Sequence, residues 1–319
     1  MSELLRRLRD NIHRVIFGKP EATRLVSAAL LARGHVLIED APGLGKTMLA
    51  RALAQSVAAE FKRIQFTPDM LPTDVTGVSV YHPERRSFEF VPGPVFTQVL
   101  LADEINRTSP RTQASLLEAM EERQVTVEGS PVPLPPLFFV IATQNPIDLE
   151  GTFPLPEAQL DRFLMQIRIG YPDPETEQRI LAAQMESHPV ESIEPVLRAD
   201  EVLDMQRDVR RVHVSDEMQR YIVEIVGRTR QLPDVRHGSS PRGSLALVRV
   251  AQALAYMDEL DYVPPDLVQE AARAVLPHRL IIERHRAGTG SSAAEIVTHV
   301  LESVPVPTER RPGLPPTVA

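Results

Sequence analysis

The chain has 319 residues, of which 43% are hydrophobic and 24% are charged, as in globular proteins long enough for two domains. Its formal net charge of −8 gives no support to binding of nucleic acids or anionic membranes. Because it has no cysteine, disulfides, thiolate metal sites and cysteine nucleophiles are excluded.

The first ten residues lack the apolar segment of a signal peptide. No apolar run approaches the roughly 20 residues that a membrane span needs. We therefore expect a cytoplasmic protein without a membrane span.

Two helices are predicted first, over residues 3–16 and from Pro20 to about Arg33, because apolar residues recur there at helical spacing. A short apolar strand begins at His35. It leads through a loop containing Gly43 and Gly45 into a helix over residues 47–60. This order of strand, glycine-containing loop and helix predicts a phosphate-binding site.

Within this loop, Lys46 would reach the β- and γ-phosphates of a nucleotide, and the hydroxyl of Thr47 would bind Mg²⁺. The usual pattern has a glycine five residues before Gly45, where this chain has Asp40. A chance Gly/Lys turn is the alternative interpretation of the loop. If it is a phosphate loop, we expect the Asp40 side chain to turn away from the phosphates and toward the protein.

Paired carboxylates end a second strand. After a short strand at Arg63–Phe66 and a β-hairpin near residues 78–90, the run from Val99 to Glu104 predicts a strand buried on both faces. In a phosphate-loop enzyme, Asp103 would support Mg²⁺ and Glu104 would activate the attacking water. The alternative is a strand that merely ends in acidic residues.

The next elements continue a β–α alternation. Ser109 and Pro110 predict a helix start, residues 124–134 a second hairpin, and residues 137–143 and 165–169 two more strands separated by a helix at 157–163. Asn145 follows the first of these strands, at the edge where parallel sheets bind ligands, although Asn-Pro also starts turns. We expect a parallel sheet with helices on both faces.

Beyond residue 172 the pattern becomes helical. Helices are predicted at 174–186, 200–211, 215–230, 241–258 and 264–275. We therefore divide the chain into an α/β core at 1–186, an all-helical domain at 187–303 and a Pro-rich, disordered tail at 304–319. None of the nine histidines has metal-site spacing, so we expect them to be surface or core residues.

Several motifs in this order resemble the AAA+ ATPases, P-loop NTPases with a helical lid, and within them the MoxR family. The resemblance covers roughly residues 10 to 285. It is carried by Phe66–Pro72, Asp103–Arg107, Ala142–Pro146, Glu150–Phe163 and Ser240–Arg242.

This resemblance implies that the chain binds ATP with Mg²⁺. Glu104 would be the catalytic base and Asn145 would position the lytic water. Thr47 and Asp103 would support the metal. The remaining implied nucleotide-binding residues are Ile16, Gly18, Pro42, Gly43, Leu44, Gly45, Lys46 and Met48, with the backbone near Ile16 to Gly18 contacting adenine.

The resemblance also assigns two arginines. Arg162 would be the arginine finger given to a neighbouring subunit's ATP, and Arg242 the second sensor, which touches the γ-phosphate. The alternative for Arg162 is a surface salt bridge to Asp161 or Glu157. For Arg242 it is a plain N-terminal helix residue, which the helix dipole slightly disfavours.

An arginine supplied by a neighbour implies a ring-shaped homo-oligomer, for which we expect a hexamer. By resemblance, the two hairpins face the ring pore or a partner, and a protein with a von Willebrand factor A domain is the expected partner class. We therefore predict an ATPase that remodels or activates a partner protein. The alternatives are a nucleic-acid motor or loader, which the negative charge disfavours, and a nucleotide-dependent switch with little turnover.

Overall fold

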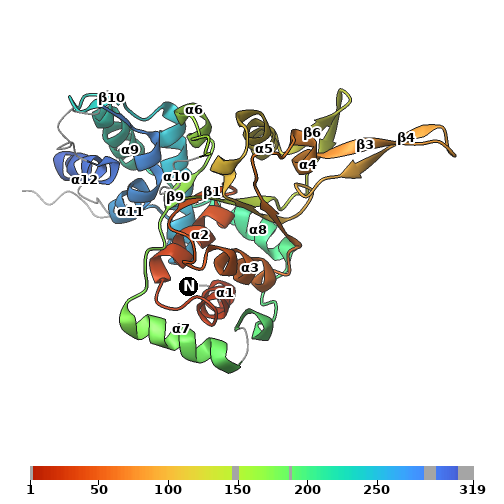
Figure 1. The fold of residues 1–319 in the computed structure, drawn as a ribbon. Helices are drawn as coiled ribbons and strands as arrows, with labels where there is room; N and C mark the ends of the chain where they lie inside the picture. Colours follow the sequence, from red (N-terminus) through yellow and green to blue (C-terminus); the bar gives the residue numbers. More distant parts are fainter. Residues whose placement is uncertain (1–2, 146–150, 187–188, 284–291, 308–319) are drawn as a thin grey trace, which may run out of the picture.

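The computed structural model describes residues 3–145, 151–186, 189–283 and 292–307, and a five-stranded sheet forms its core (Figure 1). Neighbouring strands all run parallel, as predicted, in the order β2-β5-β8-β1-β9. Their bounds are β1 (Val36–Glu39), β2 (Phe61–Gln65), β5 (Val99–Asp103), β8 (Phe139–Gln144) and β9 (Met165–Ile167).

The three inner strands β5, β8 and β1 are largely apolar because both faces of the sheet are covered there. Side chains alternate between two hydrophobic clusters, so that Val36 and Ile38 of β1 enter one cluster and Leu37 enters the other. The first cluster includes side chains of α1 (Glu3–His13), α2 (Pro20–Leu31) and α3 (Lys46–Ser56). The second includes those of α4 (Pro72–Thr76) and α5 (Pro110–Glu122).

Local capping fixes where α5 begins. The Ser109 hydroxyl accepts a hydrogen bond from the amide of Thr112, and Pro110 occupies the first turn, as predicted. Elsewhere the predicted bounds shift. The first helix ends at His13 rather than at residue 16, and the helix predicted at 157–163 is the short α6 (Glu157–Leu160).

Both predicted hairpins are present. β3 (Gly77–His82) pairs with β4 (Ser87–Pro92), and β6 (Gln124–Val127) pairs with β7 (Ser130–Pro133). The β3–β4 hairpin projects furthest from the body of the molecule (Figure 1). It is therefore free to contact another molecule.

The second half of the chain is helical, as predicted. Its helices are α7 (Pro174–Glu186), α8 (Ala199–Val209), α9 (Asp216–Thr229), α10 (Pro241–Met257), α11 (Pro265–Val275) and α12 (Ala293–Ser303). α8 and α10 both contact α2 of the core, so the two halves share one hydrophobic cluster.

Two features of this half are absent from the prediction. A short antiparallel pair joins β10 (Val235–His237) to β11 (Ile281–Ile282). α12 was also missed, although Ser292 and Glu295 form a capping box before an apolar helical pattern. The domain limits at 186 and 303 remain predictions, and the predicted tail lies outside the described residues from 308 onward.

Candidate functional site

The loop after β1 has the backbone of an anion-binding turn. Gly43 and Gly45 have φ angles of 82° and 83°, in the left-handed region that favours glycine. α3 begins directly after Gly45, and no side chain caps its N-terminus, so its first N–H groups are available to phosphate oxygens. Pro42, Leu44, Thr47 and Met48 complete the predicted nucleotide-binding set in this loop and first helical turn.

Lys46 folds back over this loop. Its ammonium group donates hydrogen bonds to the carbonyl oxygens of Asp40, at 2.5 Å, and Ala41, at 3.2 Å. Burial lowers the pKa of Lys46, whereas the nearby carboxylates of Asp103, Asp40 and Glu104 act in the opposite direction. The charges of these carboxylates therefore favour the protonated form of Lys46.

The Asp40 side chain turns toward the protein, which confirms that prediction. One carboxylate oxygen accepts hydrogen bonds from the amides of Ile169, at 2.6 Å, and Gly170, at 2.8 Å. Because these amides bind Asp40, they are not available to the sheet, and β9 ends at Ile167 rather than at the predicted residue 169. Asp40 thus ties the loop to the segment after β9.

Thr143 at the end of β8 joins the two acidic residues at the end of β5. Its hydroxyl donates to the carboxylate of Asp103 at 2.6 Å and accepts a hydrogen bond from the amide of Glu104 at 2.9 Å. All three residues lie at the carboxyl edge of the sheet, beside the glycine loop. No role for Thr143 is predicted from the sequence, although its position two residues before Asn145, at a strand end, is a usable signal.

Glu104 has an unusual backbone and an engaged carboxylate. Its φ and ψ of 57° and 49° are left-handed, which costs a non-glycine residue about 1 to 3 kcal/mol. One carboxylate oxygen accepts a hydrogen bond from Gln65 at 2.7 Å and pairs with Arg107 at 3.0 Å. This backbone turns the side chain of Glu104 out of the strand direction at the sheet edge.

The donor set at this edge fits Mg²⁺ bound together with a nucleotide. The described ranges contain no group of three or more His, Cys, Asp or Glu side chains that could hold a metal. Mg²⁺ in nucleotide sites uses one or two protein ligands, with phosphate oxygens and water completing the octahedron. Asp103, which also pairs with Arg63 at 2.7 Å, and the Thr47 hydroxyl are suited to this role.

The segment predicted to contact adenine lies near the glycine loop. Gly18 has a φ of 66°, and a Cβ there would come within 2.7 Å of the Thr176 hydroxyl in α7. Lys19, next in the chain, donates to the carbonyl of Tyr171 at 2.8 Å, one residue after the Gly170 amide that binds Asp40. The side chain of Ile16 is buried in the core, so its backbone is the part that remains for a ligand.

Asn145 directly follows β8 and is buried, with 6% of its surface exposed. The side-chain amide of Asn106 donates to its carbonyl oxygen at 3.4 Å. Asn145 therefore lies one residue past the strand end, near Thr143 and the β5 carboxylates. This position agrees with its predicted place at the sheet edge.

Arg162 and Arg242 both form ion pairs with the same carboxylate. Glu121, at the end of α5, is 3.1 Å from the guanidinium of Arg162 and 2.7 Å from that of Arg242. Glu121 is therefore an ion-pair partner of both arginines. The proposed salt-bridge partner Asp161 instead binds Arg279, at 2.8 Å.

This arginine cluster lies at the sheet edge opposite the glycine loop. It lines a cavity of about 340 Å³ with His35, the residue before β1, and with no residue of the 40–48 loop. The His35 ring contacts the carbonyl of Met120, which precedes Glu121. Because β1 has four residues, the two edges are separated by roughly 13 Å of strand, at about 3.3 Å per residue.

Two histidines are buried near this edge. Burial and, to a smaller extent, the charge of Arg123 lower the pKa of His35 to about 3, although the contact with the Met120 carbonyl acts the other way. Burial and the adjacent Arg279 also lower the pKa of His278 well below its usual value. Both rings are neutral core residues, as the sequence analysis expected for histidines without metal-site spacing.

In the described part of the chain, no helix is long and apolar enough to cross a membrane. Models of two families match: "ATPase family associated with various cellular activities (AAA)" at residues 35–165 and "AAA lid domain" at residues 227–300. These matches correspond to the sheet with its glycine loop and to the helical half.

Whole-chain relatives agree with these matches. "Uncharacterized protein YeaC" of Bacillus subtilis is 52% identical over 96% of both chains, and "Chaperone MoxR1" of Mycobacterium tuberculosis is 39% identical over 93% of this chain and 80% of its own. The crystal structure of a candidate ATPase from Cytophaga hutchinsonii is 35% identical over 96% of this chain and 95% of its own, with a TM-score of 0.89. The chain belongs to the MoxR family of AAA+ ATPases.

Proposed function

We propose that this protein hydrolyses ATP in a ring of identical subunits, for which six is the expected number, and uses the conformational change to remodel or activate a partner protein. The observation that carries this proposal is the division of the predicted site between two edges of one sheet. The glycine loop and carboxylates occupy one edge, and Arg162 with Arg242 occupy the other. A complete site then needs two subunits.

At the carboxyl edge, the loop amides and Lys46 would hold the phosphates of ATP. Glu104 would take the proton of the attacking water, and Asn145 would hold that water in line with the γ-phosphate. Mg²⁺, held by Thr47 and Asp103, would supply neutralisation of the charge on the phosphate oxygens. Such catalysis is positioning and charge stabilisation, so a rigid cluster of the kind that Thr143 builds favours it.

At the opposite edge, Glu121 indicates what the two arginines can do together. Both guanidinium groups approach the oxygens of a single carboxylate, so both can reach a single anion of similar size. The length of β1 keeps them away from the loop of their own subunit. We infer that both act on the γ-phosphate of a neighbouring subunit's ATP.

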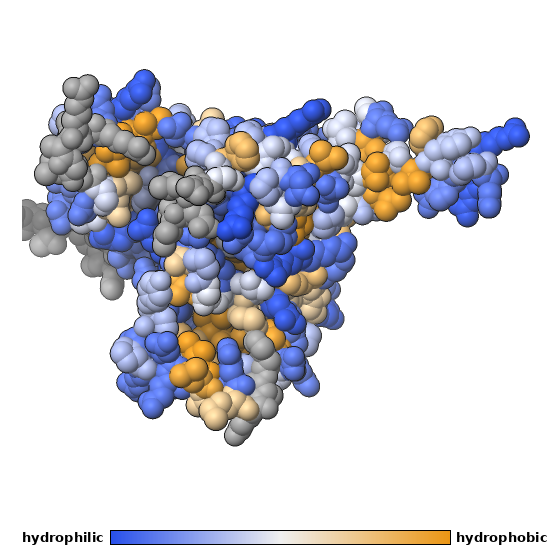
Figure 2. Space-filling model, viewed as in Figure 1, coloured by the Kyte–Doolittle hydropathy of each residue, from blue (hydrophilic) through white to orange (hydrophobic). Residues whose placement is uncertain are grey.

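The β3–β4 hairpin is the proposed contact for the partner. Its large apolar side chains are exposed, with Phe88 at 66% and Tyr81 at 49%, and their rings lie 5.2 Å apart. Figure 2 shows an apolar patch on this projecting arm, between the body and its polar tip. Exposed apolar surface of this kind is typical of an interaction site. A protein with a von Willebrand factor A domain is the partner class that we propose.

Mixing experiments test the shared site. We expect Lys46→Ala protein and Arg162→Ala/Arg242→Ala protein each to be inactive as ATPases. A mixture should regain activity, because some interfaces join an intact loop to intact arginines. If Arg242 acted on its own subunit's ATP, the mixture would stay inactive, whereas Arg162→Ala alone mixed with Lys46→Ala would recover.

Steady-state hydrolysis by wild type and Glu104→Gln tests the chemistry. We expect the wild type to turn over ATP and the variant to bind it without comparable turnover. Equal and negligible rates would replace this proposal with a nucleotide-dependent switch. Capture of partners with the ATP-bound Glu104→Gln protein, compared with a Phe88→Ser form of it, would then test the hairpin.

A further inference from the structure

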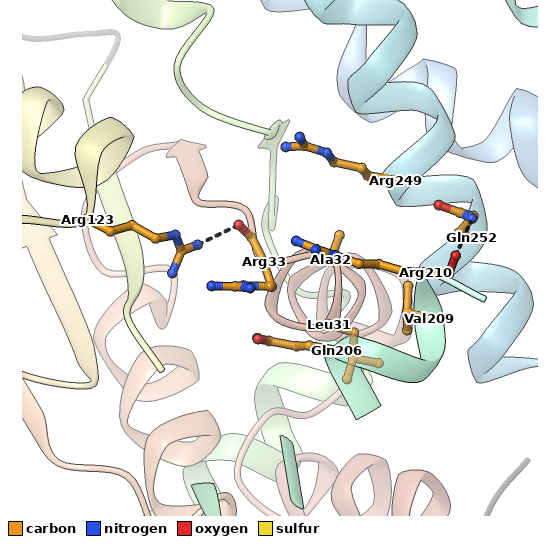
Figure 3. Close-up of a pocket in the computed structure, with 9 residues that line it drawn as sticks. All are labelled: Leu31, Ala32, Arg33, Arg123, Gln206, Val209, Arg210, Arg249 and Gln252. Atoms are coloured by element: carbon orange, nitrogen blue, oxygen red, sulfur yellow. Dashed lines mark hydrogen bonds between the residues drawn. The ribbon is translucent and has the colours of Figure 1, made fainter. Parts of the chain in front are cut away.

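A second, strongly basic pocket lies between the core and the helical half (Figure 3). Its volume is about 220 Å³, and residues from the end of α2, the end of α5, α8 and α10 line it. Figure 3 shows four guanidinium groups turned toward this shared space, those of Arg33, Arg123, Arg210 and Arg249.

These four charges have no acidic partner among the residues that the structure describes. No acidic side chain lines the pocket, and the salt bridges of the described chain include none of the four. Among the described residues, their guanidinium groups make a single hydrogen bond, from Arg123 to the carbonyl oxygen of Arg33 at 2.8 Å. By contrast, Arg162 and Arg242 share Glu121.

Helix ends account for only part of this charge. α2, α5 and α8 all end at the pocket, and Arg123 and Arg210 are themselves the C-caps of α5 and α8. A helix C-terminus carries about half a negative elementary charge, which favours a nearby cation. Three such ends offset fewer than two of the four arginine charges, so a net positive charge of about two or more remains.

The remaining charge has a measurable physical consequence. Burial, followed by the charges of Arg33, Arg210 and Arg249, lowers the pKa of Arg123 to about 10. The pKa of Arg33 is lowered in the same way by burial, Arg210 and Arg249. The four clustered guanidinium groups repel one another, an arrangement that a bound anion would stabilise.

Gln206 adds a buried polar group to the wall of the pocket. Its side chain is 5% exposed, and its amide nitrogen donates to the carbonyl of Leu30 at 2.7 Å. Its carboxamide oxygen is buried and has no hydrogen-bond partner in the described structure. A buried acceptor without a donor is unfavourable, so it favours a ligand that brings an O–H or N–H group.

We propose that this pocket is a binding site for a small phosphate-bearing anion, in which the four arginines hold a diphosphate-like group and the Gln206 oxygen accepts a hydrogen bond from the same ligand. Planar guanidinium groups are suited to phosphate oxygens, to which they donate paired hydrogen bonds. Because helices of the core and of the lid both contribute arginines, occupancy would hold the lid against the core.

This site is distinct from the two parts of the ATP site. Arg33, Arg123 and Arg249 also line the neighbouring cavity of Arg162 and Arg242, but Arg210 and Gln206 do not. The glycine loop lines neither cavity. Anion binding in this pocket therefore does not depend on ATP hydrolysis. Binding of the same anion at the glycine loop can be removed by a substitution in that loop.

The experiment is calorimetric titration of full-length Lys46→Ala protein with inorganic pyrophosphate at low salt and without Mg²⁺. We expect one binding site. Adding Arg210→Gln or Arg249→Gln should weaken binding at least tenfold, because each removes one guanidinium from the pocket. Arg211→Gln is the matched control, since Arg211 is exposed and pairs with Asp208, and it should leave the affinity unchanged.

Arg242→Gln, in the same background, should also leave pyrophosphate affinity unchanged. Absence of binding would overturn the proposal, as would equal weakening by Arg211→Gln or loss of binding in Arg242→Gln. Unfolding midpoints supply a second readout: without the anion, Arg210→Gln should be at least as stable as its parent, because repulsion falls. Dissociation of an assembled ring by pyrophosphate would show that carboxylates of a neighbouring subunit occupy the four-arginine pocket. The proposal would then fail.

Discussion

The guanidinium group of Arg242, in the first turn of α10, lies 2.7 Å from the carboxylate of Glu121, in the last turn of α5. The pair joins the lid to the core across 121 positions of sequence. Both side chains are substantially exposed, at 57% and 34%, so the pair adds little stability. We infer that its value is orientation, because the same carboxylate also receives Arg162.

Replacing Glu121 with Gln should therefore lower ATP turnover without lowering stability. The two arginines would lose their shared anion, repel one another and leave the geometry in which both reach one phosphate. We expect a drop of about threefold to tenfold in kcat for the assembled protein, smaller than the roughly 10³-fold or greater loss that removal of an arginine finger produces.

The matched control is Glu118→Gln, one turn earlier on the same helix, where the side chain is exposed. This variant should have the kcat and unfolding midpoint of the wild type. A wild-type kcat for Glu121→Gln would show that Glu121 does not orient the arginines. A large loss of stability would show that the pair is structural.

Most of the sheet and its loop could be predicted, because each strand, turn and cap is encoded by neighbouring residues. The buried run at β5 and the Ser109-Pro110 helix start are examples. Thr143 and Glu121 could not be assigned in the same way. Their partners come from other elements, about 40 residues away for Thr143 and Asp103, and only the folded sheet brings them together.

Thr143→Val should test the link between Asp103 and Glu104. Valine has nearly the same shape as threonine but lacks the hydroxyl, so the amide of Glu104 loses its acceptor and Asp103 loses a donor. We expect a stability loss of about 1 to 3 kcal/mol in urea unfolding and a clear drop in kcat. Thr143→Ser, which keeps the hydroxyl, should retain most of both properties.

Gly45→Ala should destabilise the protein through backbone conformation alone. A Cβ at this position would have no atom within 4 Å, but the φ of 83° is unfavourable for alanine. The expected cost is about 1 to 2 kcal/mol in nucleotide-free urea unfolding. Gly227→Ala is the matched control, because Gly227 lies inside α9 with equally open space, and alanine there should stabilise by up to about 1 kcal/mol.

Acid should destabilise this protein through its buried histidines before most carboxylates titrate. The folded state holds the pKa of His35 at about 3, whereas an unfolded histidine has a pKa of about 6.5. Above pH 6.5 neither state binds the proton, and the full stability is present. Between pH 6.5 and 3 the unfolded chain binds a proton that the folded chain does not, so stability falls by up to about 1.4 kcal/mol per pH unit.

Urea unfolding of wild type and His35→Gln between pH 7.5 and 5 measures this effect. The free energy of unfolding of the variant should fall less steeply as the pH is lowered, and the difference in slope should correspond to close to one proton. This holds even if the variant is less stable than the wild type at pH 7.5. The exposed His299→Gln should keep the wild-type slope. The pKa of His278 is lowered in the same direction, so this residue should add a second proton to the pH dependence of stability. A variant that lacks both buried rings should lose both contributions, because each ring titrates only in the unfolded chain.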